Sequence, residues 1–115
     1  MIKKPNEYKV DLREKMRDGN GTVKIENFAT CDELNNKGRL FGKIILEPGC
    51  SIGYHVHEHD AELFHILKGA AKYTDGDKDV TVTAGDTTFC PAGTGHGIAN
   101  EGEETVELIA LIVYE

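Results

Sequence analysis

Short runs of β-forming residues, separated by turn signals about every eight to twelve residues, are the feature that most constrains how this chain can fold. They begin at Thr22 and continue to the end of the 115-residue chain. Two of the turns have recognisable chemistry, because Glu47-Pro48-Gly49 sets a tight bend and Asp75-Gly76 is a hairpin signal. This pattern is typical of an all-β sandwich or barrel. Nine strands are predicted, at residues 22–28, 40–46, 53–57, 62–68, 70–73, 79–83, 87–90, 96–100 and 106–114.

The residues before Thr22 are charged and lack this pattern. We therefore expect an N-terminal arm at residues 1–21 and a single barrel domain at residues 22–115, because a chain of this length has room for one hydrophobic core. A short helix is predicted over residues 11–18, and Gly19 is expected to end it in the left-handed conformation. The arm is expected to pack on the barrel or on a partner chain.

The chain is acidic, with a formal net charge of -7. Nucleic-acid binding depends on clustered Lys and Arg side chains, so this charge argues against a nucleic-acid partner. The longest apolar run, at residues 108–114, is too short to cross a bilayer, and no secretory signal is recognisable. We therefore predict a cytoplasmic protein with no membrane partner. Its three cysteines, Cys31, Cys50 and Cys90, are expected to be free thiols.

The strongest chemical signal comes from His55, His57 and Glu62. One residue separates His55 from His57, so on a strand both imidazoles face the same side, as two ligands of one metal ion must. Glu62 lies an odd number of residues beyond His57 and would face the opposite side of one continuous strand. The polar stretch at residues 58–61 is short enough to reverse the chain and place Glu62 on a neighbouring strand. The three side chains are then expected to converge.

Two blocks of the sequence carry the spacing of a known family's motifs. The first, G-x5-H-x-H-x4-E-x6-G, is met by Gly49, His55, His57, Glu62 and Gly69. The second, G-x5-P-x-G-x2-H-x3-N, is met by Gly85, Pro91, Gly93, His96 and Asn100. Through these ten positions the chain resembles the cupins. The resemblance implies a double-stranded β-helix, that is, a jelly-roll cupin barrel preceded by the short N-terminal arm.

In cupins the three histidines and one glutamate of these motifs carry a metal ion. The resemblance therefore implies that His55, His57, Glu62 and His96 are the ligands here. Three imidazoles and one carboxylate suit one divalent transition ion, which could be manganese, iron, cobalt, nickel, copper or zinc. With four protein ligands, a six-coordinate ion keeps two adjacent positions for a small molecule. The motif glycines are expected to permit tight turns, and Asn100 is expected to bond a turn.

Other residues near the motifs are also candidates for a role in the site, and some of them have two interpretations. His59 is either an alternate ligand or proton shuttle, or a solvated histidine in a turn. His65 is expected to face away from the interior, and Cys90 is either a neighbour of the metal or a small buried hydrophobe, as is Cys50. An apolar surround of the metal is expected from residues on the ligand strands and nearby, namely Tyr54, Phe64, Ile66, Phe89 and Ile98.

Arg13, Arg17 and Arg39 are the only arginines, and all precede the first motif. A carboxylate clamp beside the metal therefore has few possible sources, which makes a diacid substrate less attractive unless Arg39 or a lysine enters the site.

Three functions remain open from the sequence. One is an enzyme of the dioxygenase, decarboxylase, isomerase or lyase type acting on a small molecule, another is a non-catalytic module that binds or senses a small ligand, and the third is a structural metal. A homodimer is also predicted, because a small barrel exposes strand edges that need covering.

Overall fold

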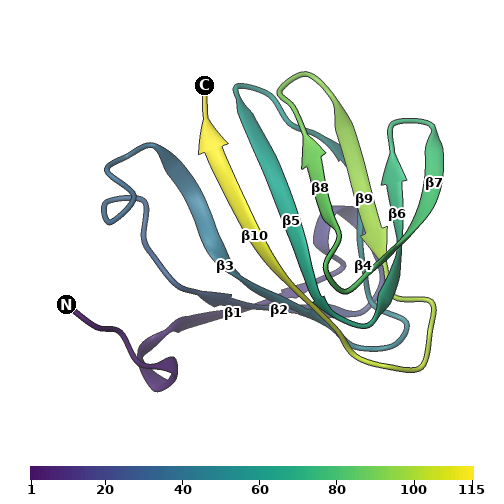
Figure 1. Ribbon diagram of the computed structural model, residues 1–115, viewed down its shortest axis with the longest axis horizontal. Coiled ribbons are helices and arrows are strands. Elements are labelled where there is room, and N and C mark those ends of the chain that lie inside the picture. The colour runs from purple at the N-terminus through teal and green to yellow at the C-terminus, as the bar shows by residue number, and fades with distance from the viewer.

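The computed structural model describes residues 1–115 as two facing antiparallel sheets (Figure 1). The larger sheet has the strand order β1-β2-β3-β10-β5-β8, and the smaller has the order β4-β9-β6-β7. The ten strands of the two sheets are β1 (Lys9–Glu14), β2 (Thr22–Asn27), β3 (Gly38–Leu46), β4 (Ser51–Val56), β5 (Asp60–Lys68), β6 (Ala70–Asp75), β7 (Lys78–Thr83), β8 (Thr87–Cys90), β9 (Gly95–Ala99) and β10 (Val106–Tyr114). This arrangement is the double-stranded β-helix expected from the sequence.

All nine predicted strands are present, with ends that differ by up to two residues. The only helical segments are two single turns of 3-10 helix, η1 (Pro5–Glu7) and η2 (Met16–Asp18). None of the helical segments is long and apolar enough to span a membrane.

The core lies between the sheets and follows from the alternation of side chains along each strand. In β10, residues at two-residue steps from Val106 to Ile112 are buried, and the residues between them are only partly covered. The same alternation in β5 buries Glu62, Phe64 and Ile66 together. The interior of the barrel therefore combines an apolar core with polar side chains from the motif strands.

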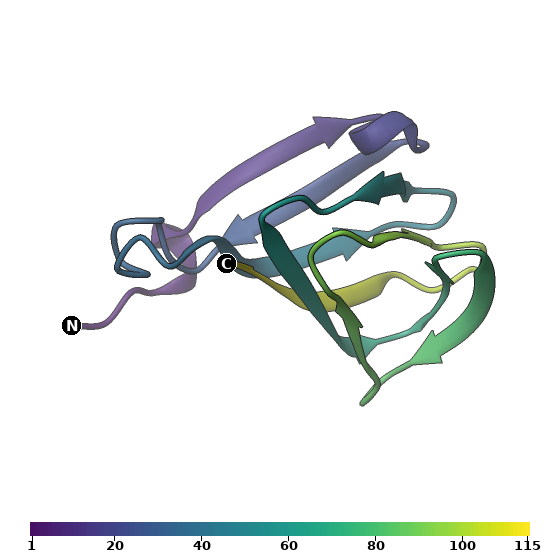
Figure 2. The same ribbon diagram turned by 90° about the horizontal axis from the view of Figure 1, so that it is seen from above.

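The predicted helix over residues 11–18 is wrong. Residues 9–14 instead form β1, which pairs with β2 from Lys9 opposite Asn27 to Glu14 opposite Thr22. The segment alternates charged and apolar side chains with a period of two, which is the strand pattern. Gly19 is extended, with a φ of -79°, and is not left-handed as predicted. The left-handed conformation is adopted instead by Lys15, Arg17 and Asp18. The N-terminal segment thus extends the larger sheet as its edge strand (Figure 2).

Two residues of the sequence motifs, Asn100 and Gly69, have a structural role in the turns of the barrel. The Asn100 side-chain amide donates hydrogen bonds to the carbonyl oxygens of Leu46 at 2.9 Å and Glu104 at 2.7 Å, as predicted. Gly69, between β5 and β6, has a φ of +84°, and a Cβ there would lie 2.9 Å from the carbonyl oxygen of Thr105. Glycine is required at this position because both the conformation and the space exclude a side chain.

Candidate metal centre

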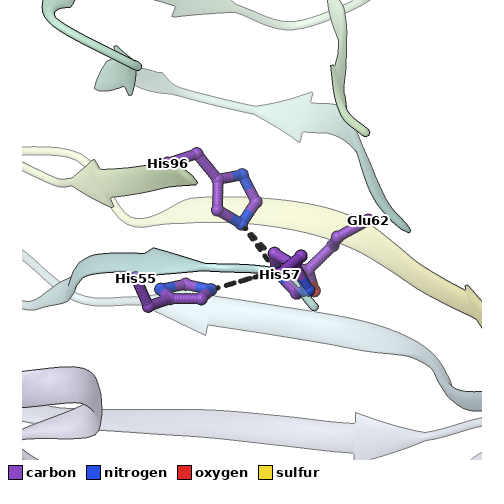
Figure 3. A group of neighbouring side chains, drawn as sticks. All are labelled: His55, His57, Glu62 and His96. Atoms are coloured by element: carbon purple, nitrogen blue, oxygen red, sulfur yellow. Dashed lines mark hydrogen bonds and ion pairs between the residues drawn. The ribbon is translucent and has the colours of Figure 1, made fainter. Parts of the chain in front are cut away.

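The structure brings His55, His57, Glu62 and His96 together at one point between the two sheets (Figure 3). His55 lies on β4, and His57 directly follows that strand. His96 lies on the neighbouring β9, where it is paired directly opposite His55. Glu62 reaches in from β5 of the larger sheet. One possible ligand atom from each of the four side chains lies within 4.8 Å of all the others, so this cluster could hold one metal ion.

A bulge in β4 turns His55 toward the interior. The register between β4 and β9 shifts between Ile52 and His55, so both residues face inward although an odd number of positions separates them. Tyr54 and Val56 consequently point outward and are exposed. The bulge therefore lets one strand contribute both an apolar residue and a potential ligand to the same wall.

Short contacts connect the four side chains. The Oε1 atom of Glu62 lies 3.0 Å from Nε2 of His57 and 2.9 Å from Nε2 of His96, and 3.8 Å from Nε2 of His55. His57, Glu62 and His96 are almost fully buried, at 2%, 4% and 0% exposure. A single carboxylate oxygen thus faces three ring nitrogens in a site largely closed to water.

Each imidazole is oriented through its other nitrogen. His55 Nδ1 donates to the carbonyl oxygen of Gly53 at 2.8 Å, and His57 Nδ1 donates to Oδ1 of Asp60 at 2.7 Å. His96 Nδ1 lies 2.8 Å from the Tyr73 hydroxyl. Such outer partners fix the ring orientation and leave Nε2 directed at the centre, as in histidine-bound metal sites.

The donor set fits a metal ion. Because His55 and His57 both donate through Nδ1, each neutral ring carries a lone pair on Nε2, yet these two atoms are 3.1 Å apart. The Nε2 atoms of His57 and His96 are also 3.1 Å apart. Lone pairs facing each other at this distance repel unless positive charge lies between them. Three imidazole nitrogens and one carboxylate supply the ligands that divalent transition metals prefer.

The charges of the cluster also suit a cation. Burial alone would raise the pKa of Glu62, but the contacts of its carboxylate with the three histidine rings hold that pKa well below its usual range. Burial lowers the pKa of His96, and hydrogen bonding to Glu62 offsets this only in part. For His57 the hydrogen bond to Glu62 outweighs burial, and the pKa is raised. Glu62 is therefore an anion at neutral pH and could serve as a ligand of a cation.

The cluster opens into a cavity of ≈ 430 Å³. His55, His57 and Glu62 form part of its wall, and this volume is sufficient for a small organic molecule. Seven of the lining residues precede β2, so the N-terminal segment forms much of the enclosure.

The charge of the cavity differs from that of the whole chain. The protein carries 13 Lys and Arg against 20 Asp and Glu, whereas the cavity is lined by five Lys and Arg against three Asp and Glu. All three arginines, Arg13, Arg17 and Arg39, are among the lining residues. The sequence left a diacid open if Arg39 or a lysine entered the site, and this condition is met, because Arg39, Lys3 and Lys9 line the cavity. The arginines precede the motifs in sequence, but β1, η2 and β3 bring them to the cavity.

Three other titratable residues lie outside the cluster. His59 is exposed in a turn, 3.4 Å from Glu115, which confirms the solvated reading. His65 faces away from the interior, as predicted, and bonds Thr87 at 2.8 Å. Cys90 is buried directly opposite Glu62 in the β5–β8 pairing, and burial raises the pKa of its thiol.

The predicted apolar surround is correct only in part. Phe64, Ile66 and Ile98 are buried in the core, and Phe64 stacks on His96 with ring centroids 4.9 Å apart. Tyr54 and Phe89 are 52% and 59% exposed, so their predicted place beside the metal is wrong. Phe89 points outward because its neighbour Cys90 pairs with Glu62 and points inward.

The sequence reasoning missed the partners that orient the ligands. Asp60 lies three residues after His57, within the turn stretch that was read only as polar. Tyr73 is distant in sequence from His96 and meets it because β6 and β9 are neighbours in the smaller sheet. The position of Asp60, three residues after His57, could have indicated a partner of that histidine. Tyr73 could be recognised as a partner of His96 only once the strand order was known.

Comparison with known proteins places the chain in a family. The sequence profile of the Cupin domain family matches residues 42–114. An oxalate-binding protein of Thermotoga maritima is 35% identical over 113 residues, which cover 98% of this chain and 93% of that protein. A crystal structure of a predicted oxalate decarboxylase from Thermotoga maritima has a TM-score of 0.95 at 35% identity and covers 100% of both chains.

Other known proteins match a shorter part of this chain, or share its fold at low sequence identity. Mannose-1-phosphate guanylyltransferase 2 of Escherichia coli O157:H7 is 37% identical over 58% of this chain, which corresponds to 14% of that protein. The cupin domain of Schizosaccharomyces pombe Cnp3 has a TM-score of 0.72 at 18% identity, over 81% of this chain and 61% of that one. Since the family profile and the long Thermotoga match both span most of the sequence, the chain belongs to the cupin family.

Proposed function

We propose that the protein binds one divalent transition-metal ion through His55, His57, Glu62 and His96. The ring orientations, the buried anionic carboxylate and the close Nε2 contacts support this assignment. When bound, the metal would act as a Lewis acid and, with four protein ligands, keep positions for a chelating small molecule.

The proposed ligand is a small dicarboxylate of the oxalate type. The observation that carries this proposal is the basic lining of the cavity, which gathers all three arginines of an acidic protein beside the metal cluster. A guanidinium group binds a carboxylate through two parallel hydrogen bonds, a contact that a neutral or basic ligand does not offer.

The long Thermotoga similarity supports the same ligand class. The family profile begins at residue 42, after all three arginines, but the oxalate-binding protein matches 98% of this chain and so includes most of the N-terminal segment. The segment that forms much of the cavity wall is therefore shared with a protein whose known ligand is oxalate.

Isothermal titration calorimetry of oxalate tests this function. We expect the manganese-loaded protein to bind one oxalate per chain and the metal-free protein to bind it much more weakly. Acetate, which has a single carboxylate, should bind poorly to both forms. An absence of oxalate binding to the metal-loaded protein would overturn the ligand assignment. Carbon-13 NMR of the same mixture distinguishes an enzyme, which consumes oxalate, from a binding protein, which leaves it unchanged.

We also propose that the chain forms a homodimer through β1. This strand is the edge of the larger sheet (Figure 2). Its side chains Val10 and Leu12 are 46% and 67% exposed. Its inward side chains are the charged Lys9, Asp11 and Arg13 of the cavity wall. A second copy would cover an exposed apolar strand edge. A cytoplasmic location stays a prediction, which the three free cysteines support.

A further inference from the structure

We propose that Arg17, presented by the 3-10 turn η2, is the specificity-determining residue that binds the two carboxylate oxygens which a metal-chelated dicarboxylate leaves uncoordinated. This inference rests on the proposed function and adds the residue that selects a diacid over a monoacid. Arg17 lines the cavity together with His55 and lies outside the residues that match the family profile.

The turn that carries Arg17 is fastened to the strand that carries the histidines. The Asn20 N–H donates to Oγ of Ser51 at 2.8 Å, and the Ser51 N–H donates to the carbonyl oxygen of Asn20 at 2.9 Å. The Lys15 N–H closes the loop by donating to the carbonyl oxygen of Gly21 at 2.8 Å. Because Ser51 begins β4, these bonds fix the position of η2 relative to His55 and His57.

Two glycines let the turn approach this strand closely. A Cβ at Gly53 would overlap the carbonyl oxygen of Arg17, and a Cβ at Gly19 would overlap the carbonyl oxygen of Ser51. Gly53 is also the residue whose carbonyl oxygen accepts the hydrogen bond from His55 Nδ1. One glycine therefore contacts both the Arg17 backbone and a proposed metal ligand, which places the turn against the metal centre.

The backbone of the turn is strained. Lys15, Arg17 and Asp18 have φ values of 49°, 54° and 63°, in the left-handed region that L-residues with a side chain rarely adopt. Such conformations persist only where the surrounding structure holds them, and they are frequent at ligand-binding sites. The contacts with β4 supply that support here, so the turn holds the backbone of Arg17 in one defined place, and its side chain is exposed.

Of the three arginines, Arg17 is the one whose guanidinium group has no carboxylate partner within the protein. Arg39 donates from Nε to Asp60 at 2.9 Å, and Arg13 lies 4.0 Å from Asp11. Arg17 forms no ion pair and no side-chain hydrogen bond, although it stands at the wall of the cavity. A guanidinium without an ion pair in the wall of the same cavity is suited to bind, through two parallel N–H groups, the two oxygens that a chelated oxalate leaves uncoordinated.

The test compares Arg17→Gln with the matched control Lys15→Gln. Lys15 lies in the same strained turn but does not line the cavity, so its substitution removes a neighbouring charge and leaves the proposed contact intact. Calorimetry on the manganese-loaded proteins should show that Arg17→Gln weakens oxalate binding by about tenfold to a hundredfold. Lys15→Gln should bind oxalate within about twofold of wild type.

Glycolate provides the second readout, because it can chelate a metal through one carboxylate and a hydroxyl but has no second carboxylate. Arg17→Gln should leave glycolate affinity and manganese content close to those of wild type, so that the preference for oxalate is lost. Gly19→Ala, which displaces the turn and retains Arg17, should also weaken oxalate binding. Oxalate binding to Arg17→Gln as tight as to Lys15→Gln would overturn this inference while leaving the proposed function intact. If the metal-loaded wild type binds no oxalate, the proposed function itself fails.

Discussion

Nδ1 of His57 donates a hydrogen bond of 2.7 Å to Oδ1 of Asp60, three residues further along the chain. The other carboxylate oxygen of Asp60 accepts a bond from Nε of Arg39 at 2.9 Å. Burial alone would raise the pKa of Asp60, but the bonds from Arg39 and His57 hold that pKa below its usual range. An ionised Asp60 therefore fixes the tautomer of His57 and connects a potential metal ligand to a cavity arginine.

Asp60→Ala should weaken metal binding by about tenfold to a hundredfold, because the His57 ring loses the partner that orients it. Asp60→Asn keeps an acceptor oxygen without the charge, so its metal affinity should fall less than that of Asp60→Ala. Competition with a chromophoric chelator measures both affinities, and Asp79→Asn, on the exposed part of β7, is the control. Unchanged affinity in Asp60→Ala would show that this hydrogen bond does not support the site.

Phe64→Ala should destabilise the metal-free protein by about 3–5 kcal/mol, because it removes a fully buried ring. Phe64 stacks on His96 and does not line the cavity, so the substitution should also lower metal affinity rather than enlarge the ligand site. Phe89→Ala is the control, since Phe89 is 59% exposed and its loss should cost much less. Urea denaturation measures both variants, and equal stabilities would contradict the assignment of Phe64 to the core.

Lys43→Met should destabilise the protein by about 0.5–1 kcal/mol at pH 8 and low salt. Lys43 lies 3.2 Å from Glu107 on β10 and 3.5 Å from Glu26 on β2, so it joins three strands. Bonding to Glu107, with a smaller contribution from Glu26, outweighs burial and raises the pKa of Lys43. The stabilisation is therefore fully present below the unfolded-state pKa of about 10.4 and is lost as the pH rises through the higher folded value.

Denaturation of wild type and Lys43→Met at increasing pH measures this difference. The gap between the two proteins should close as the pH rises through the raised pKa of Lys43, and at pH 8 it should shrink in high salt. Lys78→Met, on a strand position without an ion pair, should show no such gap. A gap that does not change with pH would mean that Lys43 stabilises the protein only through its aliphatic stem.

Leu12→Lys should convert the proposed dimer into a monomer, because it places a charge on the exposed apolar side of β1. Val80→Lys, at an exposed apolar position of β7, should leave the dimer intact if β1 is the interface. Light scattering at micromolar concentration measures both variants. A wild-type protein that is entirely monomeric under these conditions would refute the dimer.

The sequence predicted the parts of the fold that depend on local alternation. The nine strands and the shared inward face of Glu62, Phe64 and Ile66 follow from the two-residue period of a strand. Residues 11–18 were assigned to a helix because this segment is highly charged and its partner strand β2 could not be known in advance.

Features that depend on long-range pairing could not be predicted in this way. Phe89 points outward because of the β5–β8 register, and Tyr73 meets His96 because β6 lies beside β9. The arginines are distant from the motifs in sequence and reach the cavity only through the strand order of the larger sheet and the contacts of η2. The motifs therefore indicate a metal centre but not the charge of its surroundings.

Optical spectroscopy of the cobalt-substituted protein, titrated with oxalate, tests the central claim most directly. The d–d absorption of Co²⁺ reports the number and type of its ligands, so it shows both that the cluster holds a metal and that positions on this metal are open. We predict a spectrum that changes on addition of oxalate and saturates at one oxalate per chain, with no cobalt bound by His57→Ala. A tetrahedral four-coordinate spectrum that oxalate leaves unchanged would contradict the account, because it would mean a closed structural site.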